Sequence, residues 1–93
     1  MKYEIEYGRK FLKDLKLAKR RGLDLSELVH VTDMLQEGIT LPQKYKDHIL
    51  TGDYKGFREC HITPDWLLIY RIKETIQVVS LYRTGTHSDL FKK

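Results

Sequence analysis

The hydrophobic period of the chain changes after Gly8. Residues 2–7 alternate polar and apolar side chains, which predicts a strand. Tyr3, Ile5 and Tyr7 are expected to share one face of this strand. After Gly8 the apolar positions recur at helical spacing, and Gly22 is well placed to end that helix. Its apolar positions are Phe11, Leu12, Leu15 and Ala18.

A second helix is predicted to begin at Asp24 and to end near Gly38. The Asp24 side chain can cap the first turn, and Glu27, three residues later, completes the sequence pattern of a capping box. The expected buried stripe of this helix consists of Leu28, Val31 and Leu35.

The second half of the chain reads as an irregular connection followed by three strands. Residues 38–56 show no regular period, and an irregular connection of that length is more often functional than incidental. The extended segments are residues 56–62, 66–72 and 76–82, with short turns between them. Adjacent antiparallel pairing is the economical topology. We therefore predict one α+β domain over residues 1–93, in the order β-α-α-β-β-β, with about four antiparallel strands and two N-terminal helices on one face.

Composition narrows the class of protein. The 93 residues allow one domain with a modest core, and 41% of them are hydrophobic. No segment approaches the ~18 apolar residues of a membrane span, and the N-terminus lacks the pattern of a signal peptide. The single cysteine, Cys60, fits a reducing compartment. We expect a cytoplasmic protein that has no contact with membranes.

The positive charge is concentrated near the N-terminus. The net charge is +4, yet residues 1–21 carry eight basic and three acidic side chains, whereas residues 22–37 carry four acidic and no basic ones. A clustered positive field favours a polyanionic partner, either nucleic acid or an acidic protein. The alternative is that Lys13, Lys16 and Arg20 simply form the solvated face of a helix.

Three of the four histidines lie in polar segments. His30 is placed on a packing helix, which favours a structural or merely exposed role. His48 lies in the irregular connection, His61 at the end of a strand, and His87 after the last strand. If the last three strands pair in order, one edge of the sheet gathers His61, Asp65, Arg83 and His87.

Several kinds of site are disfavoured by the spacing. The chain has no His-x-x-His, H-E-x-x-H or paired-cysteine pattern, so we expect no metal and no cofactor. It also lacks the G-x-S-x-G elbow of a serine hydrolase. Cys60 and His61 are neighbours on a strand and therefore point to opposite faces, which disfavours a cysteine nucleophile.

The remaining chemistry is acid–base cleavage of a phosphodiester. Cutting RNA without a metal needs a base for the ribose 2′-OH, an acid for the departing 5′-oxygen and a cation for the phosphate charge. Imidazoles suit the first two roles because their ordinary pKa lies near neutral pH. Arg83 suits the third, unless it pairs with Asp65 or Asp89 and has a structural role. Trp66, Tyr54 and Phe91 can stack on bases, unless Trp66 is a core residue and Phe91 a C-terminal anchor.

The second half of the chain also contains three distinctive blocks in a fixed order: KDHILTGDYKGFRECHI, PDWLLIY and RTGTHSDLF. Together they resemble the YafQ branch of the RelE/ParE-type toxins of bacterial type II toxin–antitoxin systems, and the helical first half is similar in pattern. The resemblance implies an antiparallel sheet with two N-terminal helices, and metal-independent cleavage of mRNA on the ribosome.

By the same resemblance, the catalytic group consists of His48, His61, Asp65 and His87, with Arg83 stabilising phosphate charge. Trp66 and Phe91 would hold the RNA. The basic N-terminal helix, with Lys13, Lys16 and Arg20, would dock on ribosomal RNA, and an acidic antitoxin would neutralise the toxin. Two other functions remain open: a basic RNA-binding adaptor without chemistry, and a gyrase-inhibiting toxin on the same fold.

Overall fold

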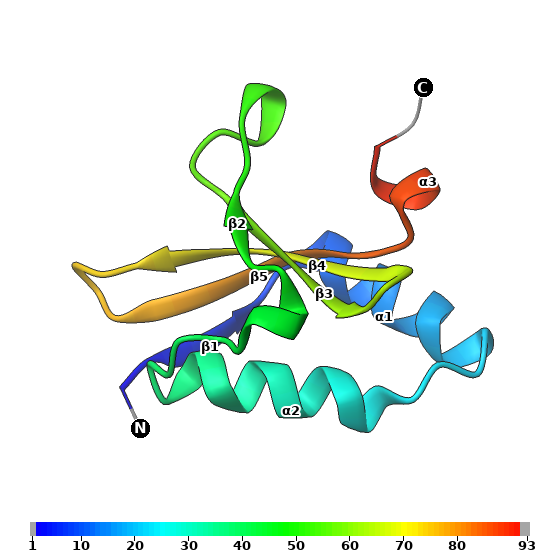
Figure 1. The fold of residues 1–93 in the computed structure, drawn as a ribbon, viewed down its shortest axis with the longest axis horizontal. Helices are drawn as coiled ribbons and strands as arrows, with labels where there is room; N and C mark the ends of the chain where they lie inside the picture. Colours follow the sequence, from blue (N-terminus) through cyan, green and yellow to red (C-terminus); the bar gives the residue numbers. More distant parts are fainter. Residues whose placement is uncertain (1, 92–93) are drawn as a thin grey trace.

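The computed structural model describes residues 2–91, which form one mixed sheet with helices on both sides of it (Figure 1). The strands are β1 (Glu4–Tyr7), β2 (His48–Ile49), β3 (Arg58–Thr63), β4 (Trp66–Lys73) and β5 (Val78–Gly85). The helices are α1 (Arg9–Arg20), α2 (Leu25–Gln36) and the short α3 (His87–Leu90), with 3₁₀ turns η1 (Gln43–Tyr45) and η2 (Gly52–Tyr54). No helix within this part of the chain is long and apolar enough to cross a membrane.

The sheet has the strand order β1-β5-β4-β3-β2. The predicted α+β class is confirmed, and β3, β4 and β5 pair antiparallel as expected. Two features differ from the expectation. β1 runs parallel to β5, with Ile5 opposite Val79, and the irregular connection contributes β2 as an additional edge strand. An alternating pattern shows that a segment is a strand but carries no information about the direction of its partner.

α1 lies beside the second half of β5, where β1 ends. Gly8 joins β1 to the helix, and its backbone N–H donates to the carbonyl of Leu81 at 2.9 Å. A Cβ atom at Gly8 would lie 2.8 Å from that carbonyl oxygen, so only glycine allows the close approach. Phe11 is buried as predicted, but Leu12 is 45% exposed because α1 contacts the sheet along a narrow stripe.

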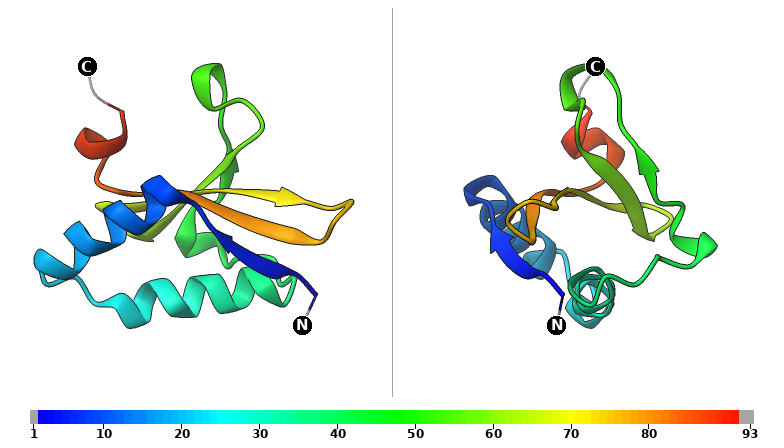
Figure 2. Two further views of the ribbon diagram at one scale, coloured as in Figure 1. Left: turned by 180° about the vertical axis from the view of Figure 1, so that it is seen from behind. Right: turned by 90° about the vertical axis from the view of Figure 1, so that its left-hand side faces the viewer.

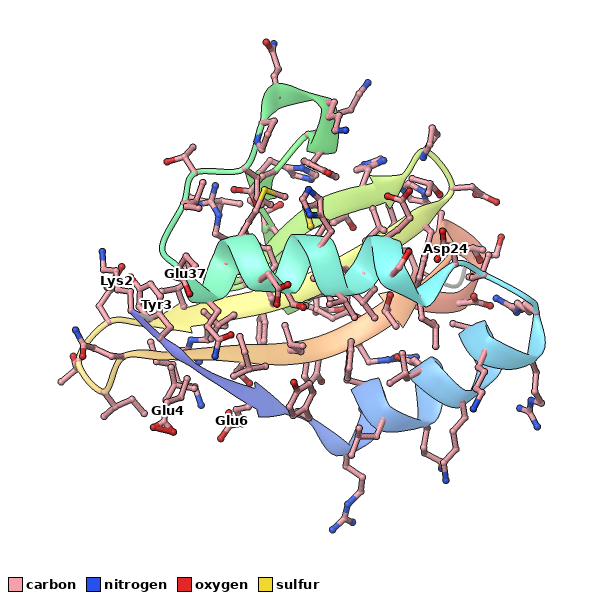
Figure 3. All side chains as sticks on the ribbon, turned by 90° about the horizontal axis from the view of Figure 1, so that it is seen from below. Lys2, Tyr3, Glu4, Glu6, Asp24 and Glu37 are labelled. Atoms are coloured by element: carbon pink, nitrogen blue, oxygen red, sulfur yellow. The ribbon has the colours of Figure 1, made fainter. Side chains whose placement is uncertain are left out.

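α2 lies along one face of the sheet, with Asp24 at one end and Glu37 at the other (Figure 3). The predicted cap is confirmed: the Asp24 carboxylate accepts the backbone N–H of Ser26 at 3.0 Å and its hydroxyl at 2.6 Å. These bonds lower the pKa of Asp24. No return bond from the Glu27 side chain is recorded within residues 2–91, so Ser26 takes the place of the expected capping box. The predicted stripe is confirmed, with all three of its members buried: Leu28, Val31 and Leu35.

β4 is buried on both of its faces, which explains its continuous apolar run. Trp66, Leu68 and Tyr70 face the main core under α1 and α2. Leu67 and Ile69 face a second, smaller apolar cluster on the opposite side of the sheet. Other members of that cluster are Leu50, Tyr54, Phe57, Tyr82, Leu90 and Phe91. The loop around β2 and η2, together with α3, therefore covers the sheet face that α1 and α2 leave free (Figure 2).

Candidate active site

The irregular connection is held to the sheet by Asp47. The Asp47 carboxylate accepts hydrogen bonds from the Arg58 guanidinium, the shortest of 2.9 Å, and from the hydroxyl of Tyr70. Burial and the bond to Asp47 raise the pKa of Tyr70, so this hydroxyl stays a donor. These bonds fix the backbone immediately before His48. His48 is therefore held at a defined place on the edge of the sheet.

His48 lies opposite Glu59 in the β2–β3 register. Its Nδ1 is 2.8 Å from the backbone carbonyl of Lys46, and its Nε2 is 3.4 Å from Glu59 Oε1. The imidazole is half exposed, whereas the Glu59 carboxylate is almost completely buried. A half-exposed imidazole backed by a buried carboxylate is a suitable arrangement for moving protons.

His61 lies on the same face of β3 as Glu59, because residues two apart on a strand point the same way. Its Nε2 is 3.8 Å from the same Oε1 atom that faces His48. On its other side, the ring centroid of His61 is 6.0 Å from that of His87, which in turn lies 5.8 Å from the ring of Phe91. Three histidines from β2, β3 and α3 thus form a continuous row on the face opposite α2.

His87 is placed by a rigid turn at the end of β5. Thr86 and Asp89 form a capping box, with Asp89 N–H donating to Thr86 Oγ1 and Thr86 N–H donating to the Asp89 carboxylate. A Cβ at Gly85 would lie 2.9 Å from Asp89 Oδ2, so this close turn requires glycine. The Arg21 guanidinium donates to the same carboxylate at 2.7 Å, and this ion pair is the main cause that holds the pKa of Asp89 below its ordinary range.

The other predicted site residues lie in different surroundings. Asp65 is exposed in the β3–β4 turn and has no hydrogen bond or ion pair recorded within residues 2–91. Arg83 is paired with Asp14 of α1, rather than with Asp65 or Asp89. The basic residues predicted to share one face of α1 are all exposed: Lys13, Lys16 and Arg20.

The two predicted stacking residues differ in accessibility. Trp66 is only 2% exposed in the main core, so neither face of its ring is open to a base. Phe91 is half-buried, and its ring centroid lies 5.4 Å from that of Tyr54. The Tyr54 hydroxyl donates to the Leu90 carbonyl at 3.2 Å and ties the η2 loop to α3. Phe91 is thus both a packing residue and the aromatic neighbour of His87.

One hollow includes a histidine of the row, and a second includes Phe91, the aromatic neighbour of His87. One, of about 410 Å³, is lined by His61, Lys44 and Lys46 among others, and brings two basic side chains beside an imidazole. The other, of about 510 Å³, is lined by Asp53, Tyr82 and Phe91 among others.

Glu59 is not among the site residues predicted from the sequence. The signal was present in the alternation of Glu59 and His61, which places an acid and an imidazole on one strand face. Cys60, between them, is fully buried in the main core, and burial raises the pKa of its thiol. The expectation that Cys60 and His61 point to opposite faces is therefore confirmed.

Residues 3–92 of the chain match the family described as the bacterial toxin of type II toxin–antitoxin system, YafQ. The chain belongs to the YafQ toxin family. The mRNA interferase toxin YafQ of Escherichia coli (strain K12) is 43% identical over 95% of both chains.

Solved structures agree with this YafQ fold. The E. coli DinJ–YafQ toxin–antitoxin complex contains a chain 40% identical to this one, with a TM-score of 0.87, over 98% of this chain and 99% of that chain. A metal-bound toxin from Helicobacter pylori is 47% identical, with a TM-score of 0.90, over 96% of this chain and 99% of that chain. Within residues 2–91 of the present YafQ-family chain, no group of three or more His, Cys, Asp or Glu side chains is arranged to hold a metal ion.

Proposed function

We propose that this type II toxin is a ribosome-dependent endoribonuclease that cleaves mRNA by metal-independent acid–base catalysis. The observation that carries the proposal is the row of imidazoles from His48 through His61 to His87, open on the face opposite α2. The relative in E. coli is named an mRNA interferase, which is the same class of activity.

The proposed reaction is an internal transfer at one phosphodiester. One imidazole removes the proton from the ribose 2′-OH, and the 2′-oxygen attacks the adjacent phosphorus. A second, protonated imidazole donates its proton to the 5′-oxygen as the P–O5′ bond breaks. The products are a 2′,3′-cyclic phosphate and a 5′-OH end. Residue His61 has a central position between the other two histidines and is therefore the first candidate for one of these roles.

The remaining groups have supporting roles. Asp65 is exposed and lies close to His61 in the sequence, and we propose that it assists proton transfer. Phe91 is proposed to hold a base beside His87. Arg83 is proposed to stabilise the phosphate charge while its Nε and Nη2 remain bonded to Asp14. We do not extend the stacking role to Trp66, because its ring is enclosed by the main core.

The proposed partners follow from charge. The exposed basic face of α1 is suited to ribosomal RNA phosphates, which would let the ribosome supply the selectivity that a small basic domain lacks. The neutralising partner is proposed to be an acidic antitoxin, as the existence of a DinJ–YafQ toxin–antitoxin complex for a relative supports.

The test is to map the 5′ ends of mRNA after brief induction, with His87→Ala as the matched inactive control. We expect new 5′-OH ends in a fixed position relative to the reading frame, absent with the control. Purified protein should give the same ends on programmed ribosomes and not on naked mRNA. Intact mRNA with arrested replication would instead indicate a gyrase inhibitor, and intact mRNA with ribosome binding an adaptor.

A further inference from the structure

An aromatic hollow is formed by the η2 loop, β5 and α3, and the η2 loop and α3 stand on the same side of the sheet (Figure 1). Its volume of about 510 Å³ falls within the range of small-molecule sites, roughly 300–1,000 Å³. The aromatic lining consists of Tyr54, Phe57, Tyr82 and Phe91. All four residues are half-buried and keep part of their surface accessible, in contrast to the enclosed Trp66.

The aromatic walls are held in place by their own contacts. The Tyr54 ring packs edge-on against Phe91, with an interplanar angle of 76°, and its hydroxyl donates to the Leu90 carbonyl. The ring centroids of Phe57 and Tyr82 are 4.8 Å apart. The Phe57 N–H donates to the Tyr54 carbonyl at 3.0 Å and closes the η2 turn. A flat ligand entering the hollow therefore meets aromatic surfaces that are already ordered, which lowers the entropic cost of binding.

Two cations lie beside these walls. Lys10 Nζ is 5.9 Å from the centre of the Tyr82 ring, and Arg71 Cζ is 5.9 Å from that of Phe57. Both basic side chains are exposed and suited to RNA phosphates. Aromatic surface with flanking positive charge is the combination that binds single-stranded nucleic acid, because bases stack on the rings while the cations contact the backbone.

Asp53 is the acidic residue of this lining. It is exposed, with no hydrogen bond or ion pair recorded within residues 2–91. A carboxylate only accepts hydrogen bonds and repels phosphate, so in this hollow it suits the donor groups of a base. An unpaired guanine offers two adjacent donors, N1–H and the N2 amino group, which match the two carboxylate oxygens. Adenine and cytosine offer one donor beside an acceptor, and uracil offers one donor between two acceptors.

We propose that this hollow is a base subsite and that Asp53 selects guanine there. The Phe91 ring lies 5.8 Å from that of His87, so the selected base belongs to a nucleotide close to the cleaved bond. Asp53 accepts from the guanine edge while Tyr54 and Phe91 contact its ring. The inference rests on the proposed nuclease function and adds the base that the nuclease prefers. A two-point contact of this kind discriminates between bases by roughly fivefold to a hundredfold.

The test compares single-turnover cleavage on ribosomes programmed with codons that differ in one base, for each codon position in turn. The wild type should cleave faster with guanine at one position, by roughly fivefold or more. Asp53→Ala should lose this preference. Asp53→Asn should transfer it to adenine, because an amide offers one donor and one acceptor to the adenine edge. Asp33→Asn, which changes an exposed acid on α2, is the matched control and should keep the guanine preference.

The outcomes separate this inference from the proposed function. Cleavage without a guanine preference, or a preference that persists in folded Asp53→Ala, would overturn the subsite and leave the nuclease intact. A wild type that cuts no programmed mRNA would remove the nuclease function. In that case GMP and AMP are titrated against the free protein, with backbone amide signals as the readout. Larger shifts of residues 51–57 with GMP, lost in Asp53→Ala, would support guanine binding, and equal responses to the two nucleotides would overturn it.

Discussion

The Arg83 guanidinium and the Asp14 carboxylate form a two-point ion pair, with Nε to Oδ2 at 2.6 Å and Nη2 to Oδ1 at 3.1 Å. Asp14 Oδ2 also accepts the backbone N–H of Thr84 at 3.1 Å. One carboxylate from α1 thus holds both the side chain and the backbone of the end of β5. The third guanidinium nitrogen, Nη1, has no hydrogen bond recorded within residues 2–91 and is the group through which we propose that Arg83 contacts phosphate.

The first prediction separates the two roles of this pair. Arg83→Lys should reduce single-turnover cleavage on the order of 10²-fold, because an ammonium cannot bind Asp14 at two points and also reach a phosphate. Asp14→Asn should lower the free energy of unfolding by about 1–3 kcal/mol, through its lost charged hydrogen bonds, but keep more activity. Cleavage rates and thermal unfolding of both variants are the measurements. A cleavage loss in Arg83→Lys that only follows its loss of stability would leave Arg83 with a structural role.

The second prediction concerns the histidine row. His61→Ala and His87→Ala should each lower the cleavage rate by ~10²–10⁴ and abolish toxicity, because each removes one proton-transfer group. His30→Ala is the matched control and should stay toxic, since that ring is exposed on α2 away from the row. Growth after induction and circular dichroism of the purified variants provide the comparison. Two folded and fully toxic site variants would remove these histidines from the mechanism.

The third prediction is a pH dependence that originates in the Arg21–Asp89 pair. The pKa of Asp89 is lowered in the folded protein, chiefly by Arg21. A depressed carboxyl pKa adds stability above the ordinary value near 3.8, and that stability is lost as the pH falls toward the folded value. Arg21→Ala should therefore lower the Tm at pH 7 and have progressively less effect as the pH falls below about 4.

The matched control for this pair is Arg20→Ala, which removes an exposed basic side chain one residue earlier. Hydrogen exchange of residues 86–91 should increase in Arg21→Ala and remain unchanged in the control, since Asp89 also caps α3. An equal effect of the two variants at every pH would mean that the ion pair contributes nothing to holding α3.

The fourth prediction addresses the basic face of α1. Reversal of Lys13, Lys16 and Arg20 to glutamate should weaken binding to ribosomes, and the residual binding should depend less steeply on salt because fewer counterions are released. The unfolding transition of the isolated protein should change little, because all three side chains are exposed. Sedimentation with ribosomes over a range of salt concentrations measures both. Unchanged affinity would identify this face as simply solvated.

The fifth prediction concerns metals. Cleavage should persist in EDTA at concentrations that leave ribosomes intact, or return with magnesium alone, because the sequence has no common metal-ligand spacing and residues 2–91 contain no group of three or more His, Cys, Asp or Glu side chains placed to hold a metal. Single-turnover assays with zinc or manganese added back decide the point. A specific need for either ion at the chemical step would contradict the proposed mechanism.

Local sequence patterns were enough to place the two long helices and most of the strands. Helical spacing and the Asp24 cap placed α2, with Leu28, Val31 and Leu35 inside, because helix periodicity and capping are local properties. The sequence also shows that His61 and His87 lie in polar segments at the ends of strands. Pairing of the last three strands is enough to bring both residues to one edge of the sheet.

The partners of the site side chains depend on contacts between elements that lie far apart in the sequence. The parallel direction of β1 depends on where α1 and α2 deliver the chain, and the pairing of Arg83 with Asp14 joins residues that lie far apart in sequence. Glu59 lies between His48 and His61 because β2 pairs with β3 in one register, and nothing in the irregular segment fixes that register locally. That register buries the Glu59 carboxylate between two imidazoles, 3.4 Å from His48 Nε2 and 3.8 Å from His61 Nε2, a position that the local sequence around Glu59 does not reveal.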